Sequence, residues 1–390
     1  MKDAPLRKLF TITLPVLMTT MLALGAGVEA WVRWRWDPSK GTPGFFESDP
    51  MRRQRLAANY TGWFAGVPVH INSLGFRDDR EYALVKGPTT FRILVLGDSV
   101  TFGHGSVGEH TYPFLLEQRL KAWRPEVDWQ VWNLAVPGYN TSQELAQLLQ
   151  VGPVYKPDLV VIGFYENDLI DNFAIAHDVR RTTVMSALKS LVQRRLYSLE
   201  LYRRVYLTLR WKLGNSTAYR QRLEHLAVED ELLAKTAQAT DLAQQQLTPI
   251  ERLTDEQVRS FTCVYGQRPN PALISEMQRD PGFATWLEAV RGLQALNASR
   301  QYRLVFFLNL IPPVCPDGDM FYDGGSAATN DFFVRIFSEG APAVSVYDEL
   351  RHRRPSQMPN ACCHAIGNTN LVKADVLFGF LRERLPATIP

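Results

Sequence analysis

Short apolar runs alternate along the chain with segments of helical spacing. The run Phe91–Leu96 is nearly continuous and predicts a strand buried on both faces. Four later runs predict further strands, at Val127–Leu134, Leu159–Phe164, Arg303–Leu310 and Ala343–Tyr347. Apolar residues at helical spacing lie between and after these runs, over 111–120, 142–149, 283–298 and 367–385. This alternation predicts an α/β fold, in which a parallel sheet has helices on both faces.

The N-terminus holds a different kind of apolar segment. Lys2, Arg7 and Lys8 precede Leu9–Val28, which contains no charged residue. About 20 residues with a rise of about 1.5 Å each are long enough to cross the hydrocarbon core of a bilayer. We therefore expect a single transmembrane helix that anchors the protein.

A cleaved secretory signal is the alternative, since Val28-Glu29-Ala30 resembles a small-residue cleavage site. We favour the uncleaved anchor, because the apolar run is long for the core of a signal peptide. Both interpretations send the rest of the chain across the membrane, to an extracytoplasmic (periplasmic or extracellular) location. Arg33 and Arg35 follow the segment, so the charge asymmetry also leaves a domain that faces the cytoplasm open.

The patterning divides the rest of the chain into segments. We expect residues 1–32 to be the anchor or signal, 33–89 an irregular connector, and 90–390 the α/β domain, with a helical insertion at about 173–282. Within the insertion, Arg180–Lys212 carries nine Lys or Arg and one acid, and its apolar residues recur at helical spacing. Such a basic amphipathic helix can lie on an anionic membrane surface, pack on the domain or cover a cleft as a lid, and all three interpretations stay open.

The composition bears on which classes of partner and cofactor the protein could bind. The apolar fraction of 46% suits a globular core, and a net charge of +3 gives no indication of a nucleic-acid partner. No zinc-type C-x-x-C pair is present, and the sequence indicates no metal and no cofactor. The four cysteines are compatible with buried thiols or with one or two disulfides, and they are Cys263, Cys315, Cys362 and Cys363. The oligomeric state cannot be inferred from the sequence.

Polar motifs stand where three of the predicted strands end. Gly97-Asp98-Ser99-Val100 follows the first strand, Asn133–Thr141 (NLAVPGYNT) ends the second, and Gly163–Asp168 (GFYEND) ends the third. Open α/β sheets place their chemistry at the carboxyl ends of the strands, so these motifs should converge on one edge. The alternative for Asp98 and Ser99 is that they only form a turn and cap a helix.

These motifs, followed by His364 near the C-terminus, resemble the SGNH hydrolases, also called the GDSL family. Ile71–Tyr82 (INSLGFRDDREY) is similar to the segment that precedes the GDS strand in membrane-anchored bacterial members. The resemblance implies a flavodoxin-like three-layer sandwich around a parallel five-stranded sheet. It also assigns the family's four marker positions to Ser99, Gly138, Asn167 and His364.

The resemblance implies a role for each of these residues. Ser99 would be the nucleophile, and His364 the base that takes its proton. The backbone N–H groups of Ser99 and Gly138 and the side-chain amide of Asn167 would form the oxyanion hole. This chemistry needs neither a metal nor a cofactor.

One position departs from the family pattern. The family usually has an Asp three residues before its His, and Ala361 stands there. Three explanations stay open, namely a Ser–His dyad oriented by a backbone carbonyl, an acid from elsewhere, and an impaired site. The nearest acids in the late loops are Asp317, Asp319, Asp323 and Asp348. Cys362 or Cys363 could join a disulfide that fixes the His364 loop, with Cys315 as one possible partner.

The sequence thus predicts an enzyme that cleaves an ester through an acyl-enzyme on Ser99. The expected substrate is an O-acyl group on an envelope carbohydrate or a lipid, presented as a small molecule or a glycan. Hydrolysis and O-acyl transfer use the same residues, so the sequence does not separate them. The alternative is a non-catalytic envelope protein with the same fold that binds glycan or assembly partners.

Overall fold

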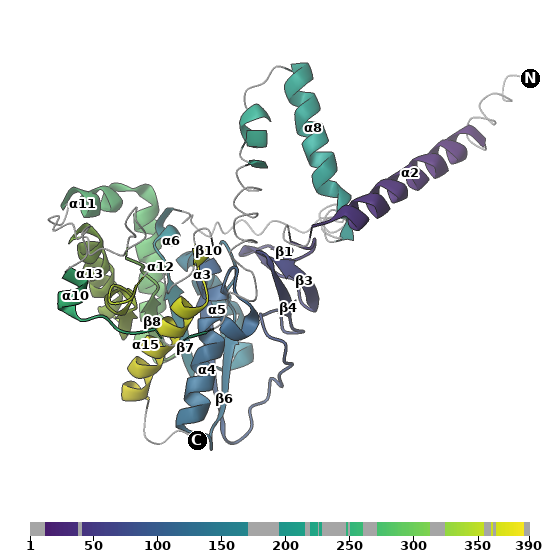
Figure 1. Ribbon diagram of the computed structural model, residues 1–390. Helices are drawn as coiled ribbons and strands as arrows, with labels where there is room; N and C mark the ends of the chain where they lie inside the picture. Colours follow the sequence, from purple (N-terminus) through teal and green to yellow (C-terminus); the bar gives the residue numbers. More distant parts are fainter. Residues whose placement is uncertain are drawn as a thin grey trace, which may run out of the picture.

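The computed structural model describes residues 12–37, 41–170, 195–214, 219–224, 226–227, 247–248, 250–259, 271–312, 324–354, 360–361 and 364–385. Its centre is a five-stranded sheet whose neighbouring strands are all parallel (Figure 1). The strands are β5 (Thr90–Gly97), β6 (Asp128–Asn133), β7 (Leu159–Phe164), β8 (Leu304–Leu308) and β9 (Ala343–Ser345). The five predicted strands and the α/β class are therefore confirmed.

The strand order is β6-β5-β7-β8-β9. The first strand of the sheet thus lies between the second and the third, which is the flavodoxin-like order. After β5 the chain forms β6, which pairs with one edge of β5. It then returns past β5 to form β7, which pairs with the opposite edge of β5. In open sheets of this kind the crevice for a ligand opens where the order reverses, at the carboxyl end of the first strand.

Two apolar clusters cover the two faces of this sheet. Leu94 and Leu96 of β5 belong to one cluster, and Ile93 and Val95 belong to the other, because successive side chains of a strand point to opposite faces. The first cluster also contains side chains of α5 (Thr141–Tyr155), α12 (Pro281–Ala298) and α13 (Gly324–Ser338). The second contains side chains of α4 (Tyr112–Trp123) and α15 (Asn368–Arg384). The domain is therefore a three-layer sandwich.

The connector is folded rather than irregular. It forms two antiparallel hairpins, one of β1 (Phe46–Asp49) and β2 (Arg53–Leu56) and one of β3 (Tyr60–Phe64) and β4 (Val67–Ile71). The second hairpin turns at Ala65-Gly66, where both residues have positive φ (52° and 79°), as a two-residue hairpin turn requires.

The hairpins pack on the α/β domain through a third apolar cluster. Phe45 and Ile71 of the connector join Phe102 and Tyr139 of the domain in this cluster. The backbone of Arg77 extends the contact, because its N–H donates to the carbonyl of Asn133 (3.2 Å) at the end of β6. The irregular sequence pattern of the connector follows from this structure, because short half-buried strands leave little periodicity.

The helix α2 (Leu14–Arg35) carries the N-terminal apolar segment. Within the described residues it is the one helix long and apolar enough to cross a membrane, with a mean hydropathy of 1.4, and a signal sequence would satisfy the same criteria. It projects away from the sandwich, and α8 (Ser198–Gly214) stands next to its C-terminal end (Figure 1).

The regular structure in the described part of the insertion is helical. It comprises α8, residues 219–224 and 226–227, α10 (Asp255–Arg259) and α11 (Pro271–Arg279). The short elements elsewhere are α3 (Ser99–Phe102), η3 (Gly108–His110), α6 (Asn167–Ile170), α14 (Tyr347–Leu350), β10 (Asn360–Ala361) and β11 (His364–Ala365). The four cysteines lie outside the described residues, so the disulfide expectation stays a prediction.

Candidate active site

The three polar motifs meet at the carboxyl edge of the sheet, at the ends of β5, β6 and β7. The chain turns sharply at Gly97, so that α3 starts directly over the end of β5. A Cβ atom at Gly97 would lie 2.2 Å from Thr101 Oγ1, which is far below van der Waals contact. Only glycine therefore lets the first turn of α3 sit this close to the strand, and this fixes the place of Ser99.

Ser99 and His364 are brought together across 265 residues of sequence. Ser99 Oγ lies 2.8 Å from His364 Nε2, which is hydrogen-bond distance. His364 lies on β11, which pairs with β10 so that Ala361 is opposite His364. The hydroxyl is therefore placed to give its proton to the imidazole.

Asp98 supports this arrangement without contacting His364. Its carboxylate caps α3 by accepting the N–H of Val100 at 2.9 Å. The Asn167 side chain hydrogen-bonds the same carboxylate. Asp98 thus caps the helix, while Ser99 Oγ contacts His364 Nε2.

Gly138 lies on the loop after β6, close to the start of α3. The N–H of Val136 donates to the carbonyl of Gly97 (2.9 Å), which ties this loop to the nucleophile turn. Gly138 is exposed, has a φ of +80°, and its N–H donates to no backbone carbonyl among the described residues. Gln54 of β2 supports the loop by donating to the carbonyl of Pro137 (3.1 Å). As the first residue of α3, Ser99 also has an N–H without an intrahelical acceptor.

Burial keeps the His364 imidazole neutral. Removal from water, together with the nearby Lys373 cation, lowers the pKa of His364 to about 4. Its other ring nitrogen, Nδ1, is buried and has no hydrogen-bond partner among the described residues.

Within the part of the chain that the structure describes, no carboxylate therefore occupies the position where a triad has one. Asp348 does not fill it, because its side chain is mostly exposed and pairs with Arg351 at 3.2 Å. The other three candidate acids, Asp317, Asp319 and Asp323, lie outside the described residues.

Sequence reasoning missed two residues next to His364. The His104 ring stacks on the His364 ring, with centroids 4.2 Å apart. Lys373 of α15 is fully buried, and its amine has no hydrogen-bond partner among the described residues. Burial lowers the pKa of Lys373 to about 8, and the charge of Asp98 partly opposes this shift. Helical spacing gave a signal for Lys373, because it lies four residues before the buried Leu377 on the apolar face of α15.

A further carboxyl group lies behind the site. Glu144 of α5 is fully buried, and neither of its oxygens has a hydrogen-bond partner among the described residues. Burial, and then the nearby charge of Asp98, raise its pKa well above the usual value for a glutamate. Burial, with the nearby backbone and Asn167 donors opposing it, also raises the pKa of Asp98, so both buried carboxyl groups are shifted toward the neutral form.

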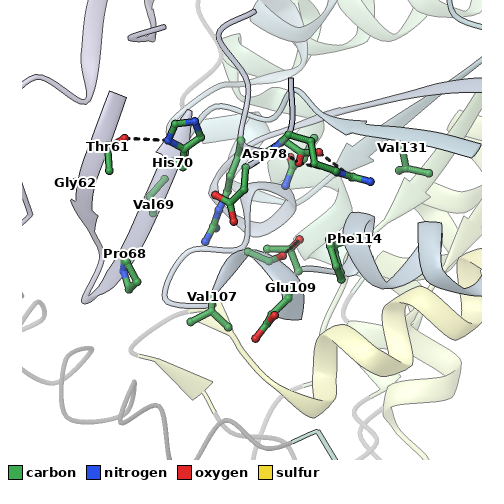
Figure 2. Close-up of a pocket in the computed structure, with 16 residues that line it drawn as sticks. Thr61, Gly62, Pro68, Val69, His70, Asp78, Val107, Glu109, Phe114 and Val131 are labelled. Carbon is green, nitrogen blue, oxygen red and sulfur yellow. Dashed lines mark hydrogen bonds and ion pairs between the residues drawn. The ribbon is translucent and has the colours of Figure 1, made fainter. Parts of the chain in front are cut away.

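A cavity of about 660 Å³ lies elsewhere, beside the β3–β4 hairpin. Figure 2 shows Thr61 and His70 of the hairpin on one side of it and Val107, Glu109 and Phe114 on the other. None of the four predicted site residues lines this cavity. It is therefore distinct from the place where Ser99 and His364 meet.

One model of a known protein family matches part of the chain. Residues 95–251 match the model of the GDSL-like Lipase/Acylhydrolase family, a range that includes Ser99, Gly138 and Asn167 but ends before His364. No curated protein sequence matches the chain significantly. The family match supports an enzyme of the serine hydrolase type that acts on ester bonds.

Three solved structures illustrate the structural likenesses. A two-domain esterase active on acetylated mannans is 12% identical, with 77% of this chain and 51% of that chain covered and a TM-score of 0.35. An acetylxylan esterase from Geobacillus stearothermophilus is 12% identical, with 75% of this chain and 94% of that chain covered and a TM-score of 0.37. The esterase EstA from Pseudoalteromonas sp. is 13% identical, with 75% of this chain and 98% of that chain covered and a TM-score of 0.38. The chain spans about half the length of the two-domain esterase.

Labelling with a fluorophosphonate tests whether Ser99 is activated. The purified full-length protein should react, and Ser99→Ala should not react at all. His364→Ala should slow labelling by about 10³-fold or more, because the base is lost. Asn167→Ala should slow it by about 10²-fold, through the loss of one oxyanion donor. As a control, His110→Ala changes a half-buried histidine of η3 and should label at the wild-type rate. Labelling of Ser99→Ala would contradict the assignment of Ser99 as the nucleophile.

The pH dependence of kcat/KM tests the environment of His364. A base works only when it is neutral, so activity is present above its pKa and is lost as the pH falls through it. With a pKa of about 4, kcat/KM for an acetyl ester at pH 5.5 should stay within about twofold of its value at pH 7. A histidine with the ordinary pKa of about 6.5 would lose about tenfold over that range, and such a loss would contradict the prediction.

Lys373→Met provides the matched test of the cause. It removes the cation beside His364, so the acid limb of the profile should move to higher pH. Lys156→Met changes an exposed lysine and should leave the profile where it is.

Proposed function

We propose that the protein cleaves carboxylic esters through an acyl-enzyme on Ser99, either as an esterase or as an O-acyltransferase. The observation that carries the proposal is the 2.8 Å contact between Ser99 Oγ and His364 Nε2. A serine hydroxyl is a weak nucleophile until a base within hydrogen-bond reach takes its proton, and His364 is held neutral for that task.

In the first half of the proposed reaction, Ser99 Oγ attacks the carbonyl carbon of the ester and its proton moves to His364 Nε2. The C–O bond to the alcohol then breaks, and the alcohol leaves with the proton that Nε2 had received. The acyl group stays on Ser99 as an ester, so the step is balanced without any co-reactant.

Three donors are proposed for the negative charge that develops on the carbonyl oxygen. The N–H of Ser99 has no acceptor within α3, and the exposed Gly138 N–H donates to no backbone carbonyl among the described residues. The amide of Asn167 has two N–H bonds, of which one suffices for the Asp98 carboxylate and the other is available for the oxyanion. Such preorganised donors usually contribute the largest part of the rate.

The second half of the reaction decides between hydrolysis and transfer. Water attacks the acyl-enzyme when it gives its proton to His364, and the products are the free acid and regenerated Ser99. A sugar hydroxyl in the same place gives a new ester instead. The residues are the same in both cases, so the acceptor that reaches the site determines the outcome.

The proposed location is a membrane, with α2 as an uncleaved anchor. The carboxylate of Glu29 accepts the N–H groups of Tyr197 (3.0 Å) and Ser198 (2.9 Å) at the start of α8. A carboxylate at a helix N-terminus is stabilising, because the first N–H groups of a helix have no intrahelical acceptor. Arg33 adds a contact over the Tyr197 ring, at 4.6 Å from its centroid. Cleavage after Ala30 would remove Glu29 from this arrangement, which favours the anchor.

The anchor proposal has a direct measurement. Intact-mass analysis of protein extracted from membranes should find residues 1–30 still attached, and a mature chain that starts at Trp31 would contradict it. Protease added to the outside of spheroplasts should digest the α/β domain if that domain is extracytoplasmic. Protection of the domain would place it on the cytoplasmic side.

The proposed substrate is an O-acyl group, such as acetyl, on an envelope carbohydrate or a lipid. The anchor would hold the site next to both kinds of ester. A non-catalytic protein that binds glycan is the competing function. The observation in its favour is that His364 Nδ1 has no hydrogen-bond partner among the described residues.

An assay on the full-length protein in detergent separates these possibilities. Acetate release from an acetylated oligosaccharide, absent in Ser99→Ala, would support the carbohydrate esterase. Release of long-chain acid from an acylglycerol would favour the lipid ester, and an acylated product that forms only with added oligosaccharide would identify a transferase. Glycan binding without turnover and without fluorophosphonate labelling would overturn the enzyme.

A further inference from the structure

Among the described residues, none makes with His364 the hydrogen bond that usually orients a catalytic imidazole. Its Nε2 contacts Ser99 Oγ, while its Nδ1 has no partner among the described residues. One hydrogen bond leaves the flat ring free to tilt about that contact. In a Ser–His–Asp triad the carboxylate on Nδ1 prevents this and holds the ring in the reactive orientation.

A second flat ring lies against His364 instead. The ring of His104 is almost parallel to it, with centroids 4.2 Å apart and an angle of 19° between the planes. His104 also meets the ring of Phe64 of β3 edge-on, with centroids 5.3 Å apart. The His364 ring can therefore tilt toward His104 only if His104 itself moves, and Phe64 restricts that movement.

The backbone of His104 is fixed relative to the nucleophile. The N–H of His104 donates to the carbonyl of Ser99 at 3.0 Å. Arg77 donates to the carbonyls of Phe102 (2.8 Å) and Gly103 (2.9 Å), just before His104 in the chain. The position of the stacked ring is thus set by the same turn that places Ser99 Oγ.

The charge of His104 is compatible with this arrangement. Burial, and then the charges of His364 and Arg77, lower the pKa of His104 to about 3. His104 is therefore neutral at neutral pH. A neutral aromatic face does not repel the imidazolium that forms on His364 during the reaction, whereas a second cation at this distance would.

We propose that His104 is the positioning residue of the catalytic base, and that its stacked ring orients His364 as the carboxylate does in a triad. The proposal rests on the proposed function of Ser99 and His364. His104 does not touch the reacting atoms, and it acts by keeping Nε2 directed at Ser99 Oγ. An aromatic ring is needed at this position, and a ring nitrogen is not.

Ester hydrolysis by three variants tests the proposal. His104→Ala removes the ring and should lower kcat by about 10²-fold with KM within twofold of the wild type, because a misdirected base impairs the chemical step and not substrate binding. His104→Phe keeps a flat ring and should retain kcat within about threefold. Phe64→Leu keeps His104 but removes the ring behind it, and should give a loss of several-fold. A fall in kcat at unchanged KM in a folded His104→Ala protein is the result that a merely structural role for His104 would not produce.

Several outcomes would overturn the proposal. One is a kcat of His104→Ala within threefold of the wild type. Another is a loss in His104→Phe as large as in His104→Ala, since that would require the nitrogen. If His104→Ala does not fold, the proposal would be overturned by full activity in Phe64→Leu together with a large loss of kcat in His104→Phe.

An acid from the late loops is the rival explanation for how His364 is oriented. Asn variants of Asp317, Asp319 and Asp323 should keep wild-type kcat. A loss of about 10³-fold in one of them, with full activity in His104→Phe and His104→Ala, would identify a triad and overturn the stacking proposal. Failure of the proposed function is distinguishable, because the wild type would then show neither turnover nor fluorophosphonate labelling.

Discussion

The buried guanidinium of Arg77 holds together the parts of the protein that the site depends on. It donates to the carbonyls of Phe102, Gly103 and Ser106, and its backbone N–H donates to the carbonyl of Asn133. A buried guanidinium is stable only when its N–H groups have acceptors, so the loop after α3 must keep the shape that supplies these carbonyls. Arg77 therefore binds the connector, the nucleophile turn and the edge of the sheet into one unit.

The sequence pattern predicts the sheet well and the connector poorly, for the same physical reason. Strands buried on both faces appear as continuous apolar runs, and the predicted strand Leu159–Phe164 has the bounds that the structure gives to β7. The strands of the connector have only four or five residues and are half-buried, so they leave little periodicity. Their burial is against Phe102 and Tyr139 of the domain, which no local pattern can indicate.

The candidate site shows the same contrast between what the sequence can and cannot predict. The motifs that hold Ser99, Gly138 and Asn167 could be placed at strand ends from the sequence, and the roles of these residues stay predictions. Pairing of Ser99 with His364 was predicted from the family order, and the 2.8 Å contact agrees with it. The stack of His104 on His364 was not predictable, because it depends on how the end of α3 meets β11, two elements that are far apart in sequence.

The surroundings of His364 set how readily its imidazole accepts a proton in the proposed reaction. Burial and Lys373 both disfavour the imidazolium, and no carboxylate among the described residues offsets them. A base with a pKa near 4 accepts a proton less readily than one matched to neutral pH. In the reaction proposed above, the barrier must then fall mainly through stabilisation of the oxyanion, by the proposed donors Ser99, Gly138 and Asn167. Such a site favours esters whose alcohol leaves easily, and it keeps its base neutral even in an acidic compartment.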